Sequence, residues 1–290
     1  VAYAPMRPDA AAEQLARELG AVFVLDGPQV LPAFAPEAAV LLLRQQGPLR
    51  ISGRPIMGAP VSSAGMEEAE LCRLAACLHA GGTRTLGLGM SLGDLCMDEG
   101  FYPAVFAQLA ETAVRLREKS GLTAKIFDLG GGFGVSCRPD CPGPDLSACA
   151  EALRAQTCAL PEALQGVQLS MSPGRFLAAG GGVLVCRVVA VKPGPTAVLD
   201  VSAAQCLRLE KRGAYHAAAA LRTAGRPPLL QQLTTLEQGA PFARQVLPQL
   251  RAGDPVIIRM LGADGRSFSC ASERCPAYLL RADGTIEPIE

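Results

Sequence analysis

Three consecutive glycines, Gly130–Gly132, follow the apolar segment KIFDL and the aspartate within it, Asp128. Glycine loses more backbone freedom on folding than any other residue and has no side chain to pack, so three together require a physical reason. One reason is a flexible linker. The other is a backbone that must approach a ligand closely at the end of a strand, where successive N–H groups can bind an anion.

Metal chemistry is not expected from the other reactive residues. The chain has 11 cysteines and 2 histidines, and its one tight cysteine pair is Cys137 and Cys141 in CRPDC. No histidine or second cysteine pair stands beside this pair at the spacing of a zinc site. Most cysteines are therefore expected to be small apolar residues of a protein in the reducing cytoplasm, and no metal site is predicted.

The composition excludes several classes of partner. Of the 290 residues, 49% are hydrophobic and 19% are charged, which indicates a folded chain with a sizeable core. Lys+Arg and Asp+Glu both number 27, so no basic surface for nucleic acid is implied. The longest apolar runs, such as residues 180–191, are too short and too interrupted to cross a membrane. No secretory signal is recognised, although the chain begins with Val1.

The glycine run lies in a part of the chain where strand-like and helix-like segments alternate. Apolar runs predict strands over residues 1–6, 21–27, 38–44, 85–93, 124–132 and 166–176. Amphipathic periodicity predicts helices over residues 9–20, 65–82, 101–121 and 146–161. Repeated strand–helix pairs with apolar strands indicate an α/β domain with a parallel sheet, either open or closed into a barrel.

The pattern changes after about residue 180. Short β-rich segments such as TAVLDVSA and DPVIIRMLGADG follow one another, separated by turn signals such as ADG. This half of the chain is predicted to be a second, mostly antiparallel domain of ordinary size.

Several motifs in a fixed order carry a resemblance to a known family. They are AYAPMRPD, LGLGMSLGDLC, FDLGGGF, SPGRFLAAGGGVLVCRVVAVK and VLPQLRAGDPVIIRMLGADGRSFS. Together they resemble the alanine-racemase-fold decarboxylases that use pyridoxal phosphate, which act on ornithine, arginine or diaminopimelate. The resemblance runs along most of the chain. It implies a TIM-type β/α barrel at residues 1–180, followed by a mostly antiparallel β domain at residues 181–290.

The resemblance also implies a cofactor site. In the family, the backbone N–H groups of the glycine run and the arginine after Pro-Gly bind the cofactor phosphate, which places Gly130, Gly131, Gly132 and Arg175 at that group. Backbone donors and a guanidinium suit a dianion. Arg44, at the end of AVLLLR, is similar to the family's arginine near the cofactor ring. Taken singly, a glycine turn and a surface arginine would explain these residues; jointly, the phosphate site is the preferred interpretation.

The residue that should hold the cofactor covalently is missing from the pattern. The family uses a lysine on its first barrel strand, and the matching residue here is Met6, followed by Arg7. Arginine stays protonated and cannot form the imine. The lysines of the chain are Lys119, Lys125, Lys192 and Lys211, and none stands on that strand. Pyridoxal phosphate is therefore not expected to be bound covalently, and no catalytic residue is assigned.

Other positions depart from the family pattern in the same direction. The positions of the ring-stacking histidine, a phosphate-binding serine, the carboxylate at the pyridine nitrogen and a late tyrosine are occupied by Ser91, Asp94, Ser172 and Asp264. The cysteine–aspartate pair that crosses the dimer interface is matched by no clear counterpart; Thr234 and Thr235 stand nearest. The negative charge of Asp94 would repel a phosphate.

The barrel is expected to be incomplete. The strand over residues 21–27 is followed almost directly by residues 38–44, which resemble the fifth barrel strand, so about two strand–helix units are absent. Because strand number and shear must agree in a closed barrel, either residues are missing from this sequence or the barrel is open or rearranged.

Three functions follow from these observations. The preferred hypothesis is a non-catalytic homologue of the ornithine-type decarboxylases, related to polyamine metabolism. It would regulate or scaffold by binding a protein: a paralogous decarboxylase subunit, a second copy in a dimer, or an antizyme-like regulator. The alternative is a divergent pyridoxal-phosphate-dependent carboxy-lyase acting on ornithine, arginine, lysine or diaminopimelate. The third is a site for another phosphorylated small molecule.

Overall fold

The computed structural model describes most of the chain as two compact units. The described residues are 2–3, 9–27, 41–46, 50–51, 54–55, 65–91, 96–136, 142–205, 215–237, 242, 244–263 and 275–289. The first unit comprises Val1–Gly134 and Gly143–Pro173, and the second comprises Val135–Pro142 and Gly174–Glu290. Each unit has its own sheet.

The first unit is built on a six-stranded parallel sheet whose spatial order follows the chain, β1-β2-β3-β6-β7-β8. The strands are β1 (Ala2–Tyr3), β2 (Val22–Leu25), β3 (Leu41–Gln45), β6 (Thr85–Met90), β7 (Thr123–Asp128) and β8 (Gln168–Ser170). A small antiparallel pair, β4 (Arg50–Ile51) and β5 (Arg54–Pro55), is separate from it. Consecutive parallel strands connected through helices are the arrangement of a β/α barrel wall.

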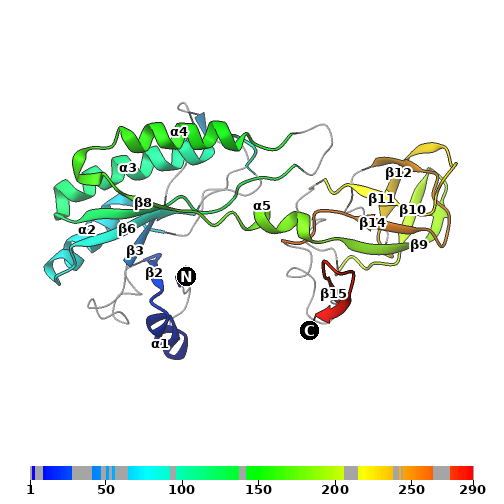
Figure 1. The fold of residues 1–290 in the computed structure, drawn as a ribbon, viewed down its shortest axis with the longest axis horizontal. Coiled ribbons are helices and arrows are strands. Elements are labelled where there is room, and N and C mark those ends of the chain that lie inside the picture. The colour runs from blue at the N-terminus through cyan, green and yellow to red at the C-terminus, as the bar shows by residue number, and fades with distance from the viewer. Residues whose placement is uncertain are drawn as a thin grey trace. The chain divides into compact units, whose positions relative to one another are not determined.

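The helices of the first unit begin and end where the sequence supplies caps. They are α1 (Ala10–Glu18), α2 (Glu68–Ala80), α3 (Phe101–Ser120) and α4 (Leu146–Cys158). Asp9 accepts hydrogen bonds from the N–H groups of Ala11 and Ala12, which are free at a helix N-terminus. Helix α3 ends at Gly121, whose φ of 77° is left-handed. Helices α3 and α4 lie side by side over one face of the sheet (Figure 1).

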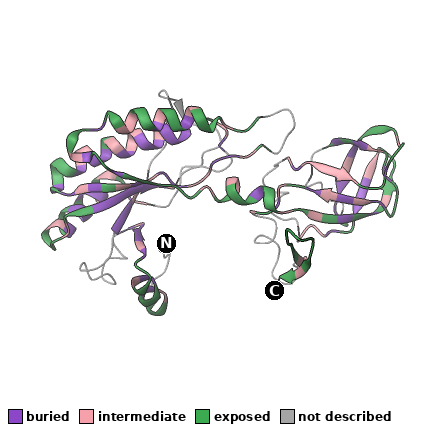
Figure 2. Ribbon diagram, viewed as in Figure 1, coloured by how far each residue is buried: buried purple, intermediate pink, exposed green. Residues whose placement is uncertain are grey.

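The core of the first unit lies between this helical layer and the sheet. Leu43, Leu88 and Phe127 form one row across β3, β6 and β7, and all are fully buried. Phe127 meets Phe106 of α3 edge-on, with ring centroids 5.5 Å apart. Burial of each such side chain contributes roughly 1.5–3 kcal/mol. Most residues of these strands are buried, whereas the outer surfaces of α3 and α4 are exposed (Figure 2).

The second unit contains a six-stranded sheet in the order β11-β14-β9-β10-β12-β13. Its strands are β9 (Leu184–Lys192), β10 (Thr196–Leu199), β11 (Ala218–Ala220), β12 (Pro228–Thr234), β13 (Gln245–Pro248) and β14 (Pro255–Ile258). All neighbours are antiparallel except β10 and β12. The hairpin β15 (Ala277–Leu280) and β16 (Ile286–Ile289) follows. The mostly antiparallel character expected from the sequence is confirmed.

A glutamine side chain links the two edge strands of this second sheet. Gln245 on β13 donates from Nε2 to the His216 carbonyl at 2.7 Å. Its Oε1 accepts from the Ala218 N–H on β11 at 2.7 Å and from the Tyr215 hydroxyl at 3.2 Å. Gln245 is buried, so these hydrogen bonds are shielded from water. They stand in for backbone hydrogen bonds between β11 and β13, and the sheet is therefore nearly closed into a barrel.

Candidate functional site

Four residues form a row across the carboxyl ends of neighbouring strands in the first unit. The register pairs Arg44 of β3 with Gly89 of β6, Gly89 with Asp128 of β7, and Asp128 with Ser170 of β8. Successive residues of a strand point to opposite faces. The row therefore faces away from the helical layer against which Leu43, Leu88 and Phe127 pack. In a barrel this face is the interior, and its carboxyl end is where functional residues gather.

Gly89 allows the strands of this row to approach closely. A Cβ at position 89 would lie 2.9 Å from Leu42 Cδ2 and 3.0 Å from Asp128 Cβ. Real Cβ atoms almost never come this near, so any side chain here would push against β3 and β7. The glycine-rich composition of β6 thus has a packing reason.

Arg44 is held in place by an aspartate. Asp26 follows directly after β2, and its two carboxylate oxygens lie 2.9 and 3.1 Å from Arg44 Nη1. The Arg44 and Asp26 side chains are 17% and 25% exposed, so the pair is partly shielded from water. Arg44 Nε and Nη2 have no acceptor among the described residues, and both remain available to a ligand oxygen.

Asp128 is the carboxylate of the row itself, whereas Asp26 lies outside the row. Burial raises the pKa of the Asp128 carboxyl above its ordinary value of 3.8, and this outweighs the opposite influence of the Gly130 N–H, Arg44 and Ser170. The Gly130 N–H donates to Asp128 Oδ1 at 3.2 Å, which connects the row to the glycine run.

The glycine run is fixed on several sides by backbone hydrogen bonds. The Ser172 N–H donates to the Gly130 carbonyl at 2.8 Å, and the Cys96 N–H donates to the Gly132 carbonyl at 2.9 Å. The Gly134 N–H donates back to the Cys96 carbonyl at 2.8 Å. Segments distant in the sequence therefore hold residues 130–134 against the sheet edge.

Close packing explains why these positions are glycine. Gly130 and Gly132 have φ values of 71° and 88°, which side chains rarely tolerate. A Cβ at Gly130 would collide with the Met90 carbonyl oxygen, and one at Gly131 would lie 2.7 Å from the Ser172 carbonyl oxygen. The linker interpretation is therefore wrong: the glycine run is packed closely against the chain's own Met90 and Ser172 carbonyl groups. Close approach to a ligand stays a prediction.

The described contacts leave two donors of the glycine run unused. The N–H groups of Gly131 and Gly132 have no acceptor within the described part of the chain. Successive free N–H groups in a loop with left-handed residues suit an anion such as a phosphate.

An aromatic pair packs next to the glycine run. Phe133 stacks on Tyr102 of α3 with ring centroids 4.9 Å apart and planes 8° apart. Tyr102 is fully buried, and burial is the main cause that raises its pKa to about 12. The phenol is therefore neutral at physiological pH, and its ring acts as packing beneath the loop.

The structure places the other predicted residues as follows. Arg44 and the glycine run share the carboxyl edge of the first sheet, as expected for one site. Arg175 lies in α5 (Gly174–Ala178) of the second unit. Ser91 and Ser172 border Gly130 and Gly131. Thr234 and Thr235 are buried in the second unit. Met6, Asp94 and Asp264 lie outside the described residues.

Besides Gly89, two polar residues of the site were not predicted from the sequence. Asp26 ends the apolar segment AVFVLD as Asp128 ends KIFD, and both strands are parallel. Polar residues at the carboxyl ends of such strands meet at one edge, so this signal could have found Asp26. Ser170 has no comparable signal, because its membership depends on the register of β8.

The described residues fit one end of pyridoxal phosphate and not the other. The glycine run offers N–H donors for a phosphate. The row offers Arg44, Gly89, Asp128 and Ser170, none of which is an amine that could bind an aldehyde. The lysines Lys119 and Lys125 of the first unit are both exposed.

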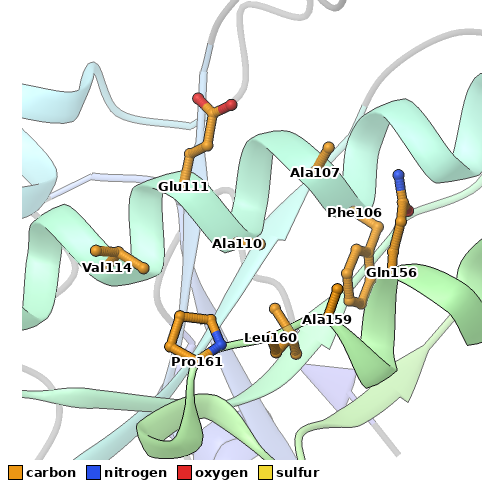
Figure 3. A pocket seen from close by; sticks show the side chains of 9 residues that line it. All are labelled: Phe106, Ala107, Ala110, Glu111, Val114, Gln156, Ala159, Leu160 and Pro161. Atoms are coloured by element: carbon orange, nitrogen blue, oxygen red, sulfur yellow. The ribbon is translucent and has the colours of Figure 1, made fainter.

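The helical layer carries an apolar groove of about 290 Å³ between α3 and the end of α4. Figure 3 shows Phe106, Ala159 and Leu160 lining it, with the carboxylate of Glu111 directed away from Pro161. The groove contains no cluster of reactive groups, so it is not the candidate site. Among the described residues no group of histidine, cysteine or acidic side chains could hold a metal, and no helix could span a membrane.

Comparison with known proteins adds a family match. Residues 64–179 match the family described as pyridoxal-dependent decarboxylase, pyridoxal binding domain. Protein TabA of Pseudomonas amygdali pv. tabaci is 29% identical over 93% of this chain and 66% of its own length. Diaminopimelate decarboxylase of Campylobacter jejuni is 31% identical over 56% of this chain and 40% of its own length. The chain thus spans between 40% and 66% of these two relatives.

Solved structures share the fold over most of the chain. Diaminopimelate decarboxylase from M. jannaschi superposes with a TM-score of 0.83 at 19% identity, covering 97% of this chain and 69% of that one. A lysine/ornithine decarboxylase from Vibrio vulnificus, complexed with cadaverine, gives 0.72 at 22% identity, covering 93% and 70%. These likenesses confirm the predicted fold class, a β/α barrel followed by a β domain.

Proposed function

We propose, from the match of residues 64–179 to the pyridoxal binding domain of pyridoxal-dependent decarboxylases, that this protein is a divergent amino-acid decarboxylase of the ornithine, arginine, lysine and diaminopimelate type. The observation that carries the proposal is the glycine run, which is packed against two neighbouring strands and keeps the N–H groups of Gly131 and Gly132 available for a phosphate. The fold likeness to diaminopimelate decarboxylases supports the same reaction class.

The glycine run and the residues of the row would together hold the ligands of this reaction. Gly131 and Gly132 would bind the cofactor phosphate through their N–H groups. When bound, pyridoxal phosphate supplies an electron sink for the bond that breaks in an amino acid. Arg44 would direct Nε and Nη2 at a carboxylate or ring oxygen, while Asp26 fixes the direction of its guanidinium. Asp128 would accept a hydrogen bond from an ammonium group.

The test is release of carbon dioxide from ornithine, arginine, lysine and diaminopimelate by the purified chain with added pyridoxal phosphate. Arg44→Gln is expected to lower kcat/KM by roughly tenfold or more, the scale of one charge-assisted contact. Arg84→Gln is the matched control, because the Arg84 side chain donates only to the carbonyls of His79 and Thr83 among the described residues. Absence of turnover with all four amino acids would reject the decarboxylase proposal.

A specific observation favours a second candidate, a non-catalytic homologue that acts by binding a protein. The residue matching the family lysine is Met6, and the described lysines of the first unit are not in the row. In this candidate the partner is a paralogous decarboxylase subunit, a second copy of the chain or an antizyme-like regulator. It predicts no turnover together with a stoichiometric protein partner on co-purification. A monomer that captures no partner and turns over an amino acid would reject it.

A further inference from the structure

We infer that this chain binds the phosphorylated cofactor through its phosphate group, without a covalent bond from lysine. The inference rests on the cofactor site proposed above and specifies how that site works. The described residues include N–H donors for the cofactor phosphate, on Gly131 and Gly132. They include no amine near these donors that could bind the cofactor aldehyde.

Lys125 is on the correct strand but at the wrong end. It lies near the start of β7, whereas Asp128 and the glycine run are at the carboxyl end. A strand rises about 3.3 Å per residue, so roughly 10 Å of backbone separates the Lys125 and Asp128 positions. The pairing of β6 with β7 is also irregular here: Leu86 pairs with Ala124 and Gly87 with Ile126, so Lys125 has no partner residue on β6. The Lys125 side chain is exposed rather than directed into the row.

Lys119 is also remote from the row. It lies in the last turn of α3, which ends at Ser120, and β7 begins at Thr123. This short connection must lie at the amino edge of the sheet, opposite the edge that carries Gly130. The Lys119 side chain is 59% exposed, and its Nζ is 4.0 Å from Glu68 Oε1 of α2.

The row itself contains no substitute for the missing amine. Arg44 is its one cation, and a guanidinium stays protonated and does not form an imine. Its Nη1 is also occupied by Asp26. In the second unit, Lys192 is exposed at the end of β9. Lys211 lies outside the described residues, so the experiment below must examine it directly.

A site that recognises the phosphate and not the aldehyde has a measurable consequence. Pyridoxal, pyridoxamine and pyridoxine 5′-phosphates share the phosphate and the ring and differ only at the carbon that a lysine would capture. A covalent site prefers the aldehyde strongly, whereas contacts to a shared phosphate contribute equally to all three. The chain is therefore expected to bind the three compounds with dissociation constants within about threefold of one another, a difference of roughly 0.7 kcal/mol.

The test titrates the full chain with each of the three compounds by calorimetry. A parallel sample with pyridoxal 5′-phosphate is reduced with borohydride and analysed by peptide mass spectrometry. Gly131→Ala is expected to weaken all three affinities alike by tenfold or more, because its Cβ would lie 2.7 Å from the Ser172 carbonyl oxygen. Gly81→Ala is the matched control, since its Cβ would make ordinary contacts at 3.5 Å.

Equal affinities and no site-specific adduct support the inference. Adducts that pyridoxine 5′-phosphate does not block also support it, because they are reactions of exposed lysines outside the site. A stoichiometric adduct on any lysine, Lys211 included, that pyridoxine 5′-phosphate blocks would overturn the inference and leave the proposed cofactor site intact. Failure of all three compounds to bind would overturn both.

Discussion

At the scale of single residues, two carboxylates, the half-buried Asp128 in the first unit and the buried Asp254 in the second, have opposite pKa shifts for identifiable reasons. Asp128 is shielded by the sheet and forms no ion pair with a described residue, so burial dominates and raises its pKa. Asp254 in the second unit accepts hydrogen bonds from both terminal nitrogens of Arg226 and from the Arg251 N–H. The Arg226 guanidinium holds the pKa of Asp254 below its usual range. The surroundings, not the residue type, decide the sign.

Asp128→Asn is expected to stabilise the first unit at neutral pH by about 1 kcal/mol, the scale of a single buried polar change. The asparagine oxygen can still accept from the Gly130 N–H, while the cost of burying a charge disappears. Because the folded pKa is raised, the charge destabilises the fold above that pKa. The cost vanishes as the pH falls through the raised pKa toward 3.8.

Hydrogen exchange at the amides of β7, compared between wild type and Asp128→Asn, measures this effect. The advantage of the variant should be present at neutral pH and absent near pH 3.8, the ordinary aspartate value. A variant that is less protected than wild type at neutral pH would show that the charge of Asp128 is favourable in the fold.

At the scale of elements, both six-stranded sheets have contacts at an edge that take the place of strand-to-strand hydrogen bonds. In the first unit the glycine run packs its backbone on the ends of β6 and β8. In the second unit the Gln245 amide joins β13 to β11. Both sets of contacts give hydrogen-bond partners to backbone groups at a sheet edge, where no further strand is available to pair with them. Unpaired N–H and C=O groups are the main energetic problem of a sheet edge.

Gln245→Leu is expected to destabilise the second unit by about 2–4 kcal/mol. The substitution leaves the His216 carbonyl and the Ala218 N–H without their partner in a buried site, and each such group costs about 1–3 kcal/mol. Thermal unfolding monitored by hydrogen exchange at β11 and β13 measures the change. Gln249→Leu is the matched control, because Gln249 is exposed and uses only its backbone in hydrogen bonds to described residues. Equal stabilities of the two variants would contradict closure of the sheet by Gln245.

At the scale of the whole molecule, the two units are expected to respond differently to acid. The folded pKa of Asp254 is lowered, so its contribution to stability is complete above 3.8, the ordinary value, and is lost as the pH falls through the lowered pKa. In the first unit the free-energy cost of burying the charged Asp128 carboxylate disappears at higher pH than this, as the pH falls from its raised pKa to 3.8. The Glu68–Arg115 pair there, 32% and 40% exposed, is screened by solvent and contributes little.

Acidification is therefore expected to reduce protection in the second unit before the first. Hydrogen exchange, corrected for its intrinsic pH dependence, should show amides of β9 and β14 losing protection below pH 3.8 while amides of β6 and β7 keep theirs. Asp254→Asn should show little further loss in that range, because its acid-sensitive group is gone. Simultaneous loss in both units, unchanged by the substitution, would contradict this assignment.

The sequence by itself determined the elements and the fold class, because these depend on local patterns. The periodicity of residues 101–121 predicted α3, which the structure ends one residue earlier at Ser120. The glycine run was recognised as unusual from composition alone. Local patterns were less accurate at strand ends: the strand expected over 166–176 is β8 (Gln168–Ser170) followed by α5 (Gly174–Ala178). Pro173-Gly174 is a turn signal inside that range, and it marks the point where the extended segment gives way to the short helix.

Only the tertiary structure decided which residues share the site. Arg44, Gly89, Asp128 and Ser170 come together because four strands distant in the sequence adopt one register, and a shift by one residue would turn every side chain to the other face. The same holds for the glycine run: the local sequence was compatible with a flexible linker, and only the folded chain brings the Met90 and Ser172 carbonyl groups so close that positions 130 and 131 must lack a side chain. Register and contact between distant segments are properties of the folded chain, and no local pattern encodes them.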